Sequence, residues 1–128
     1  MKKAILTIFI LSSLFTLNAQ IAGSKYKGSM NIPSPAAVIW SFTKDTAYLI
    51  NVEDGNNMTK NDVIETMSYT LKDNILTIKK ISGLSDCEEA VGKYKLELKD
   101  DKMFVTLIDD PCSNRSYAFN KDPFIKQN

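Results

Sequence analysis

The chain has 128 residues, with 16 Lys and Arg against 15 Asp and Glu, two cysteines and no histidine. This length suffices for one domain with a substantial core, and the near-neutral charge offers no basic stripe for nucleic acid. Without histidine, the chain lacks the commonest general base and a principal zinc ligand. We therefore expect a protein that is not an enzyme, has no metal site and no cofactor, and binds no nucleic acid.

The first residues have the three parts of a secretory signal peptide. Lys2 and Lys3 precede an uncharged, mostly apolar run over residues 4–17, and Ala19 supplies a small residue for the peptidase. The run is shorter than the about 20 apolar residues of a membrane span. We expect residues 1–19 to be a signal peptide and residues 20–128 to be one exported domain, periplasmic or extracellular, with no membrane span after cleavage.

The remaining chain divides into short segments rich in Val, Ile, Tyr, Phe and Thr, which predicts β-strands. Alternation is clear at Val38, Trp40 and Phe42, and a period of two is typical of antiparallel sheets with one solvated face. We predict an all-β, eight-stranded antiparallel up-and-down meander that closes into a barrel. The expected strands cover residues 22–28, 37–43, 46–52, 63–71, 75–81, 91–98, 103–109 and 114–120.

The connections alternate in length. Tight turns are expected at residues 44–45, 72–74 and 99–102, and longer connections at residues 29–36, 53–62, 82–90 and 110–113. Alternate connections of a meander lie at the same end, so we expect all four longer ones at one end of the barrel, here called the loop end.

The loop end is expected to be acidic. A solvated surface that resists aggregation is one interpretation, and a surface that attracts a basic protein partner is the other. The residues concerned are Glu53, Asp54, Asp62, Asp86, Glu88, Glu89, Asp109 and Asp110, against Lys60 alone within the loops.

The two cysteines, Cys87 and Cys112, are expected to form a disulfide, because an exported protein with an even cysteine count favours pairing. The predicted hairpin of residues 91–98 and 103–109 folds about Asp100 and Asp101, so paired residues have numbers that sum to about 201. Cys87 and Cys112 sum to a similar number, which places them close together just beyond the open end of that hairpin.

Two segments give the chain a family resemblance. Asp109-Asp110-Pro111-Cys112-Ser113-Asn114-Arg115 resembles the closing segment of small exported bacterial lipocalin-like barrels, and Ala22-Gly23-Ser24-Lys25-Tyr26-Lys27-Gly28 resembles their opening strand. The region around Asn18-Ala19-Gln20 is similar to signal peptides of Bacteroidetes. The resemblance implies a barrel with an apolar ligand.

The predicted inner face supplies the candidate ligand-binding residues, with Glu65 and Arg115 as their polar members. Glu65 lies on the apolar face of its strand, so it is either exposed at the strand end or a buried carboxyl with a shifted pKa. Arg115, the only arginine, is expected to close the barrel against Trp40 or a carboxylate, with a ligand contact as the alternative. The full set is Trp40, Phe42, Glu65, Met67, Tyr69, Leu96, Val105 and Arg115.

These features favour an extracytoplasmic, non-enzymatic protein that holds a small apolar or amphipathic ligand in a β-barrel. The alternative is an envelope protein-binding module, an inhibitor or scaffold, that acts through the acidic loop end.

Overall fold

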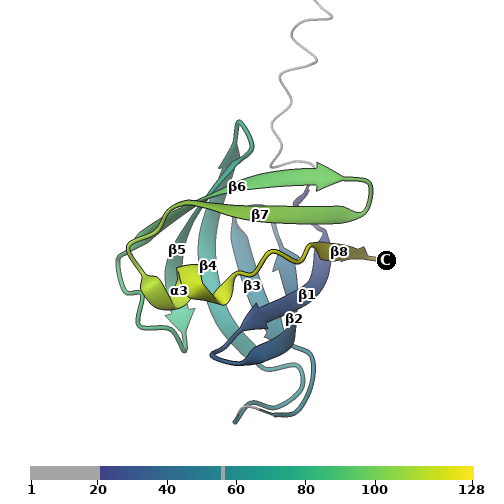
Figure 1. Cartoon of the computed structure of the whole chain (residues 1–128), viewed down its shortest axis with the longest axis vertical. Coiled ribbons are helices and arrows are strands. Elements are labelled where there is room, and N and C mark those ends of the chain that lie inside the picture. The colour runs from purple at the N-terminus through teal and green to yellow at the C-terminus, as the bar shows by residue number, and fades with distance from the viewer. Residues whose placement is uncertain (1–20, 56) are drawn as a thin grey trace, which may run out of the picture.

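The computed structural model describes residues 21–55 and 57–128, and the expected signal peptide lies outside them. Eight antiparallel strands follow one another around a closed barrel (Figure 1). The predicted all-β meander and its closure are thus confirmed. The strands are β1 Lys25–Asn31, β2 Pro35–Phe42, β3 Thr46–Asn51, β4 Val63–Lys72, β5 Ile75–Gly83, β6 Val91–Lys99, β7 Lys102–Asp109 and β8 Phe124–Gln127, with one short helix, α3 Ser113–Ala118, between β7 and β8.

The alternation of side chains has its expected consequence. In β2, Val38, Trp40 and Phe42 are buried, and in β6 Tyr94 and Leu96 are buried between exposed charged residues. Because successive side chains point to opposite faces of a strand, this pattern builds an apolar barrel interior and a polar exterior.

The tight turns are made by residues that tolerate a left-handed backbone. Asp73 and Asn74 join β4 to β5 with φ of 53° and 65°, as a two-residue hairpin turn requires. In the hairpin of β6 and β7, Leu96 pairs with Val105 and Lys99 with Lys102, so the predicted register about Asp100 and Asp101 is correct.

The expected long connection over residues 29–36 is wrong. β1 and β2 extend toward each other until Asn31 pairs with Pro35, which leaves a short turn with a cis peptide bond between Ile32 and Pro33. The connections at this end after β3 and β5 are long as predicted, and the connection after β7 is longer than the predicted residues 110–113 because it contains α3.

The expected strand over residues 114–120 is also wrong, because most of it forms α3. Arg115 and Ala118 are the buried residues of the helix, and their spacing of three places them on one helical face. The last strand, β8, begins only at Phe124 and completes the barrel by pairing with β1 and β7.

The seam formed by β8 is short. Three residue pairs join β8 to β1, from Lys25 with Gln127 to Lys27 with Ile125, and two pairs join it to β7. The Phe124 ring packs directly against Gly28, where any Cβ would collide with it. Gly28 therefore allows this buried ring to lie close to β1 and to hold the seam together.

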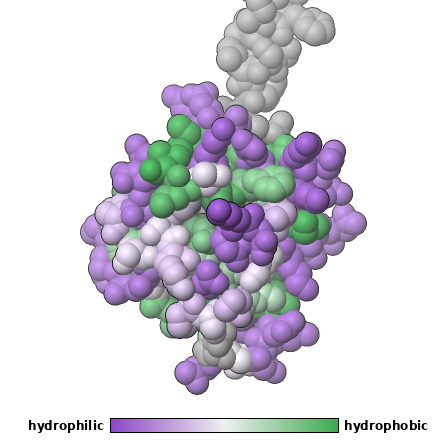
Figure 2. All heavy atoms as spheres, viewed as in Figure 1, coloured by the Kyte–Doolittle hydropathy of each residue, from purple (hydrophilic) through white to green (hydrophobic). Residues whose placement is uncertain are grey.

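The surface seen in Figure 2 is mostly hydrophilic, with several separate apolar patches. Within the described residues, no helix has the length and apolarity needed to cross a membrane.

Candidate functional site

The disulfide between Cys87 and Cys112 joins two parts of the loop end. Its Cα atoms are 5.3 Å apart, and it links the β5–β6 connection to the residue that precedes α3. The predicted pairing is confirmed, and the bridge indicates that the domain folds where thiols are oxidised. It also fixes the position of α3, whose side chains form part of the site.

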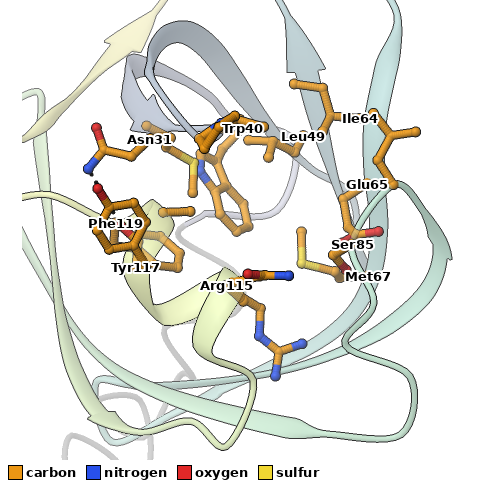
Figure 3. A pocket seen from close by; sticks show the side chains of 16 residues that line it. Asn31, Trp40, Leu49, Ile64, Glu65, Met67, Ser85, Arg115, Tyr117 and Phe119 are labelled. Carbon is orange, nitrogen blue, oxygen red and sulfur yellow. Dashed lines mark hydrogen bonds between the residues drawn. The ribbon is translucent and has the colours of Figure 1, made fainter. Parts of the chain in front are cut away.

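A cavity of about 280 Å³ lies at the loop end of the barrel (Figure 3). Its walls come from the end of β1 and the β1–β2 turn, from β2, β3 and β4, from the β5–β6 connection, and from α3 and the residue after it. Most of the lining is apolar, as in typical ligand pockets. The lining residues are Met30, Asn31, Ile32, Pro33, Trp40, Leu49, Ile64, Glu65, Met67, Leu84, Ser85, Asn114, Arg115, Tyr117, Ala118 and Phe119.

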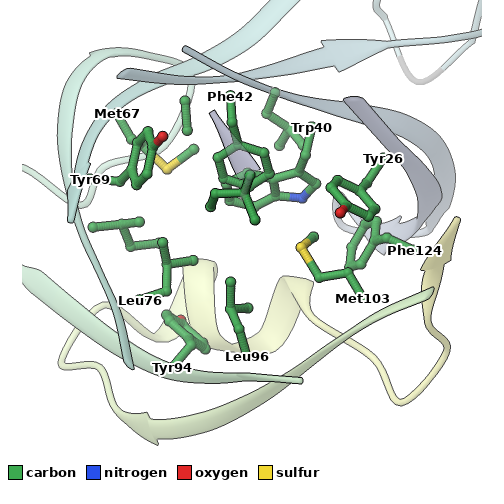
Figure 4. Packing of buried hydrophobic residues seen from close by; sticks show 14 of the residues in the cluster. Tyr26, Trp40, Phe42, Met67, Tyr69, Leu76, Tyr94, Leu96, Met103 and Phe124 are labelled. Carbon is green, nitrogen blue, oxygen red and sulfur yellow. The ribbon is translucent and has the colours of Figure 1, made fainter. Parts of the chain in front are cut away.

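Trp40 separates the cavity from the packed part of the interior. Its ring stacks on Phe42, with centroids 5.6 Å apart, and on Phe119 after α3, with centroids 5.8 Å apart. Phe42 in turn packs edge-on against Tyr69 at 5.3 Å, and Figure 4 shows these side chains pointing into the barrel. The interior is therefore filled by side chains on one side of Trp40 and hollow on the other.

The predicted site residues divide accordingly. Trp40, Glu65, Met67 and Arg115 line the cavity. The other four, Phe42, Tyr69, Leu96 and Val105, do not line it; the first three are buried in the core and Val105 packs partly buried against it.

Arg115 forms a buried ion pair with Asp110. Its Nε and Nη2 donate to the carboxylate at 2.6 and 2.8 Å, and Nη2 also donates to the carbonyl oxygen of Ala90 at 3.0 Å. The Tyr94 hydroxyl donates to the same carboxylate. The expectation that Arg115 meets a carboxylate is confirmed, and that carboxylate is one of the residues assigned to the acidic surface.

The pair has little space around it. Gly92 on β6 lies beneath it, and a Cβ at that position would be 2.9 Å from Arg115 Nη2. Burial alone would raise the pKa of Asp110, but the hydrogen bonds from Arg115 and Tyr94 hold it below its ordinary value. Burial, together with the Asp110 carboxylate, raises the pKa of the Tyr94 phenol, which therefore stays protonated as a donor. We call Tyr94, Asp110 and Arg115 the ion-pair cluster.

Glu65 is buried as well, with 6% of its surface exposed. The pairing of β3 with β4 shifts between Leu49 and Ile50, which pair with Glu65 and Val63 and leave Ile64 as an extra residue. This bulge puts Ile64 and Glu65 inside and leaves Val63 exposed. The interpretation of Glu65 as exposed at a strand end is therefore wrong.

The surroundings of Glu65 leave its carboxyl group poorly compensated. Its Oε1 occupies the space beside Gly83 that a Cβ would fill, and the Lys80 ammonium donates to the carbonyl of Ser85 nearby. Burial raises the pKa of Glu65, and the opposing effects of Ser85, Lys80 and Arg115 do not cancel it. We call Glu65 and Ser85 the open polar pair.

Four buried side-chain atoms among the described residues have no hydrogen-bond partner: Trp40 Nε1, Glu65 Oε1, Ser85 Oγ and Arg115 Nη1. All four belong to residues that line the cavity. Buried polar atoms without partners are uncommon and costly, and here they occur at one place. The cavity therefore combines apolar walls with four residues that have unused hydrogen-bonding capacity.

The sequence pattern does not reveal the parts of the site that lie outside the strands. Ser85 and Leu84 belong to the β5–β6 connection, and Tyr117, Ala118 and Phe119 to α3 and the residue after it. The spacing of Arg115 and Ala118 was the available sign of a helix, but a single turn has no distinct periodic pattern.

The acidic residues of the loop end are partly engaged by the protein itself. Asp54 and Asp62 accept backbone N–H groups at 2.8 and 2.9 Å, and Asp86 accepts from the Asn114 amide at 2.6 Å. Glu89 pairs with Lys79 at 2.7 Å. The Asp110 side chain is fully buried, so its assignment to an acidic surface is wrong.

The described part of the chain contains no cluster of three or more Asp, Glu, Cys or His side chains arranged to hold a metal ion. Comparisons with protein-family models, curated proteins and solved structures found no match to this chain.

Proposed function

We propose that this protein is an extracytoplasmic, non-enzymatic binding protein that holds one small apolar or amphipathic ligand in the cavity at the loop end of its barrel. The observation that carries the proposal is that all four residues whose buried polar atoms lack a hydrogen-bond partner line one apolar cavity. These atoms have already lost their hydration in the folded protein. A ligand that binds them would therefore gain hydrogen bonds without a further desolvation cost for these protein atoms.

The entrance also suits an apolar ligand. Leu84 and Tyr117 line the cavity yet are 71% and 66% exposed. A ligand entering between the β5–β6 connection and α3 would first contact these side chains, which contribute further apolar surface to cover its exposed part.

Titration with a panel of fatty acids, isoprenoids and an apolar dye tests the proposal, with the emission of Trp40 as the signal. Trp40 is the only tryptophan and lines the cavity, so an occupied cavity changes its surroundings directly. Native mass spectrometry should show one guest per chain. A dissociation constant of about 100 μM corresponds to a binding free energy of about −5.5 kcal/mol. If no member of the panel binds more tightly than this, the proposal is wrong.

A matched pair of variants locates the binding site. Ala118→Leu places a larger side chain in the cavity wall and should abolish binding, whereas Ala37→Leu makes the same change on β2, next to the inward-facing Val38 and hence on the outer face. Equal binding by both variants would place the ligand elsewhere.

The alternative proposal is an envelope protein-binding module that acts through the loop end. The exposed Leu84 and Tyr117, close to the acidic loops, favour it, because interfaces combine an apolar centre with a polar border. An association rate with a basic partner that is independent of salt would contradict the electrostatic part of this alternative.

A further inference from the structure

The cavity volume limits the size of the part of the ligand that it encloses. At the roughly 30 Å³ that a water molecule occupies in the liquid, a volume of about 280 Å³ holds about nine or ten non-hydrogen atoms. A medium-chain or single-ring compound fits within it, and the apolar walls require most of those atoms to be carbon.

The hydrogen-bonding character of the unpartnered atoms indicates which kind of polar group the ligand carries. The indole nitrogen of Trp40 and the guanidinium of Arg115 can only donate hydrogen bonds, whereas the Ser85 hydroxyl can donate or accept. Glu65 is the only acceptor-only group when ionised, and it becomes a donor when protonated. A ligand with several acceptors and no donor satisfies this set, and a carboxylate has that composition.

The charges around the cavity require a proton to accompany such a ligand. Arg115 is already neutralised by Asp110 through two hydrogen bonds, and Lys80 on β5 and Arg115 on α3 are the cations that act on Glu65. A ligand carboxylate beside an ionised Glu65 would put two like charges together. One shared proton removes this repulsion, as in other pairs of adjacent carboxyl groups.

Resting on the binding function proposed above, we propose that the cavity binds a medium-chain monocarboxylic acid, with Arg115 Nη1 donating to the ligand and with Glu65 and the ligand sharing one proton. The proton comes from solvent when the acid enters as its carboxylate, and returns to solvent when the acid leaves. The burial of Glu65, which raises its pKa, favours this protonated state.

The first test compares head groups on one chain length by calorimetry. Octanoate, octanol and octylamine have the size that the cavity accepts. At about pH 6 we expect octanoate to bind about tenfold more tightly than octanol, because it gains charge-assisted hydrogen bonds, and octylamine to bind most weakly. Octanol or octylamine binding as tightly as octanoate would overturn this inference but leave the proposed function intact. No binding by any of the three would also overturn this inference, whereas the proposed function is decided by the wider panel described above.

The second test measures the affinity for octanoate between about pH 6 and pH 9. In the wild-type protein, affinity should fall by up to about tenfold per pH unit once free Glu65 ionises, as uptake of one proton requires. In Glu65→Gln the amide donates without a proton, so octanoate should still bind but with no such slope. Glu53→Gln, an exposed change at the same end of the barrel, should keep the wild-type slope. A flat wild-type profile, or a slope that persists in Glu65→Gln, would overturn the inference.

Discussion

Two carboxyl groups are buried at the loop end, and they differ in how many hydrogen bonds they accept. Asp110 accepts hydrogen bonds from Arg115, from Tyr94 and from the backbone N–H of Cys112. Glu65 lines the cavity and has one oxygen without a hydrogen-bond partner. The pKa of Asp110 is lowered, whereas that of Glu65 is raised.

The difference separates a structural polar group from one available for binding. A fully hydrogen-bonded ion pair is strongly stabilising relative to its broken forms, and the ion-pair cluster fixes α3 against β6 and the end of β7. The open polar pair gives the folded state no comparable benefit, because burial costs Glu65 its hydration and supplies too few hydrogen bonds in return. Only the open pair has unused capacity that a ligand can take.

The largest expected effect comes from breaking the ion-pair cluster. Asp110→Asn leaves the guanidinium of Arg115 buried without its counter-charge, and the free energy of unfolding should fall by about 3–5 kcal/mol. Thermal unfolding followed by circular dichroism measures the loss. Asp109→Asn removes an exposed charge from the adjacent position and should change stability by less than about 0.5 kcal/mol.

The same variant tests the pKa of Asp110. Because this pKa is lower in the folded protein than its ordinary value of 3.8, the carboxylate stabilises the fold above that value and loses its effect as the pH falls through the folded pKa. The stability difference between wild type and Asp110→Asn should therefore shrink at low pH. A difference that stays constant down to about pH 2 would contradict the role assigned to Asp110.

The disulfide connects the ion-pair cluster to the open polar pair, because Cys112 adjoins the cluster and Cys87 follows Ser85 by two positions. Its two cysteines are 25 residues apart, and opening this loop by Cys87→Ser with Cys112→Ser should cost about 3–4 kcal/mol. Denaturant unfolding with and without reductant measures the effect. Reductant should destabilise the wild type and leave the double variant unchanged.

A smaller effect is expected beside the open polar pair. Gly83 has φ of 137°, and a Cβ there would collide with Glu65, whereas Gly55 has a similar φ of 144° with no atom near that position. Alanine is strained at both sites, so the additional cost of Gly83→Ala over Gly55→Ala measures the collision with Glu65 and with the backbone oxygen of Ile64. We expect this difference to be about 1–3 kcal/mol in the free energy of unfolding, and equal losses would show that Glu65 and the adjoining backbone of β4 have room to move.

The smallest effect, and one of opposite sign, is expected for Glu65→Gln. Because the folded pKa of Glu65 lies above its ordinary value of 4.5, the folded wild type is favoured at low pH and loses stability as the pH rises through the folded pKa. The variant should thus match the wild type near pH 4 and be more stable by about 1 kcal/mol near pH 8. A destabilised variant at pH 8 would mean that ionised Glu65 supports the fold.

Alternation in the sequence predicts whether a side chain points into the barrel, but not how far along the barrel it lies. Trp40 and Phe42, or Met67 and Tyr69, share an inner face by alternation, as predicted. Alternation does not say which member lies beside the cavity and which lies in the packed core, because that depends on the register of all eight strands and on what closes each end. In the structure, one residue of each pair, Trp40 or Met67, lines the cavity.

The errors at the end of the chain have a related cause. Arg115, Tyr117 and Phe119 alternate with polar or small residues and so favoured a strand, although the segment from Ser113 to Ala118 is helical. A helix this short has little intrinsic stability. It is held by contacts that the local sequence does not reveal, namely the ion pair with Asp110 and the disulfide that precedes it.

The short seam at β8 has a consequence for the kinetics of folding. Its pairing with β1 brings together residues separated by roughly one hundred positions, whereas every other strand pair in the barrel, apart from β7 with β8, joins neighbours across a single turn or loop. Because contacts between distant residues form slowly, the barrel should close last at this seam, after the seven-stranded meander has assembled. Amide protons along β8 should then exchange with solvent sooner than those of β4 and β5, since local opening would start at the seam.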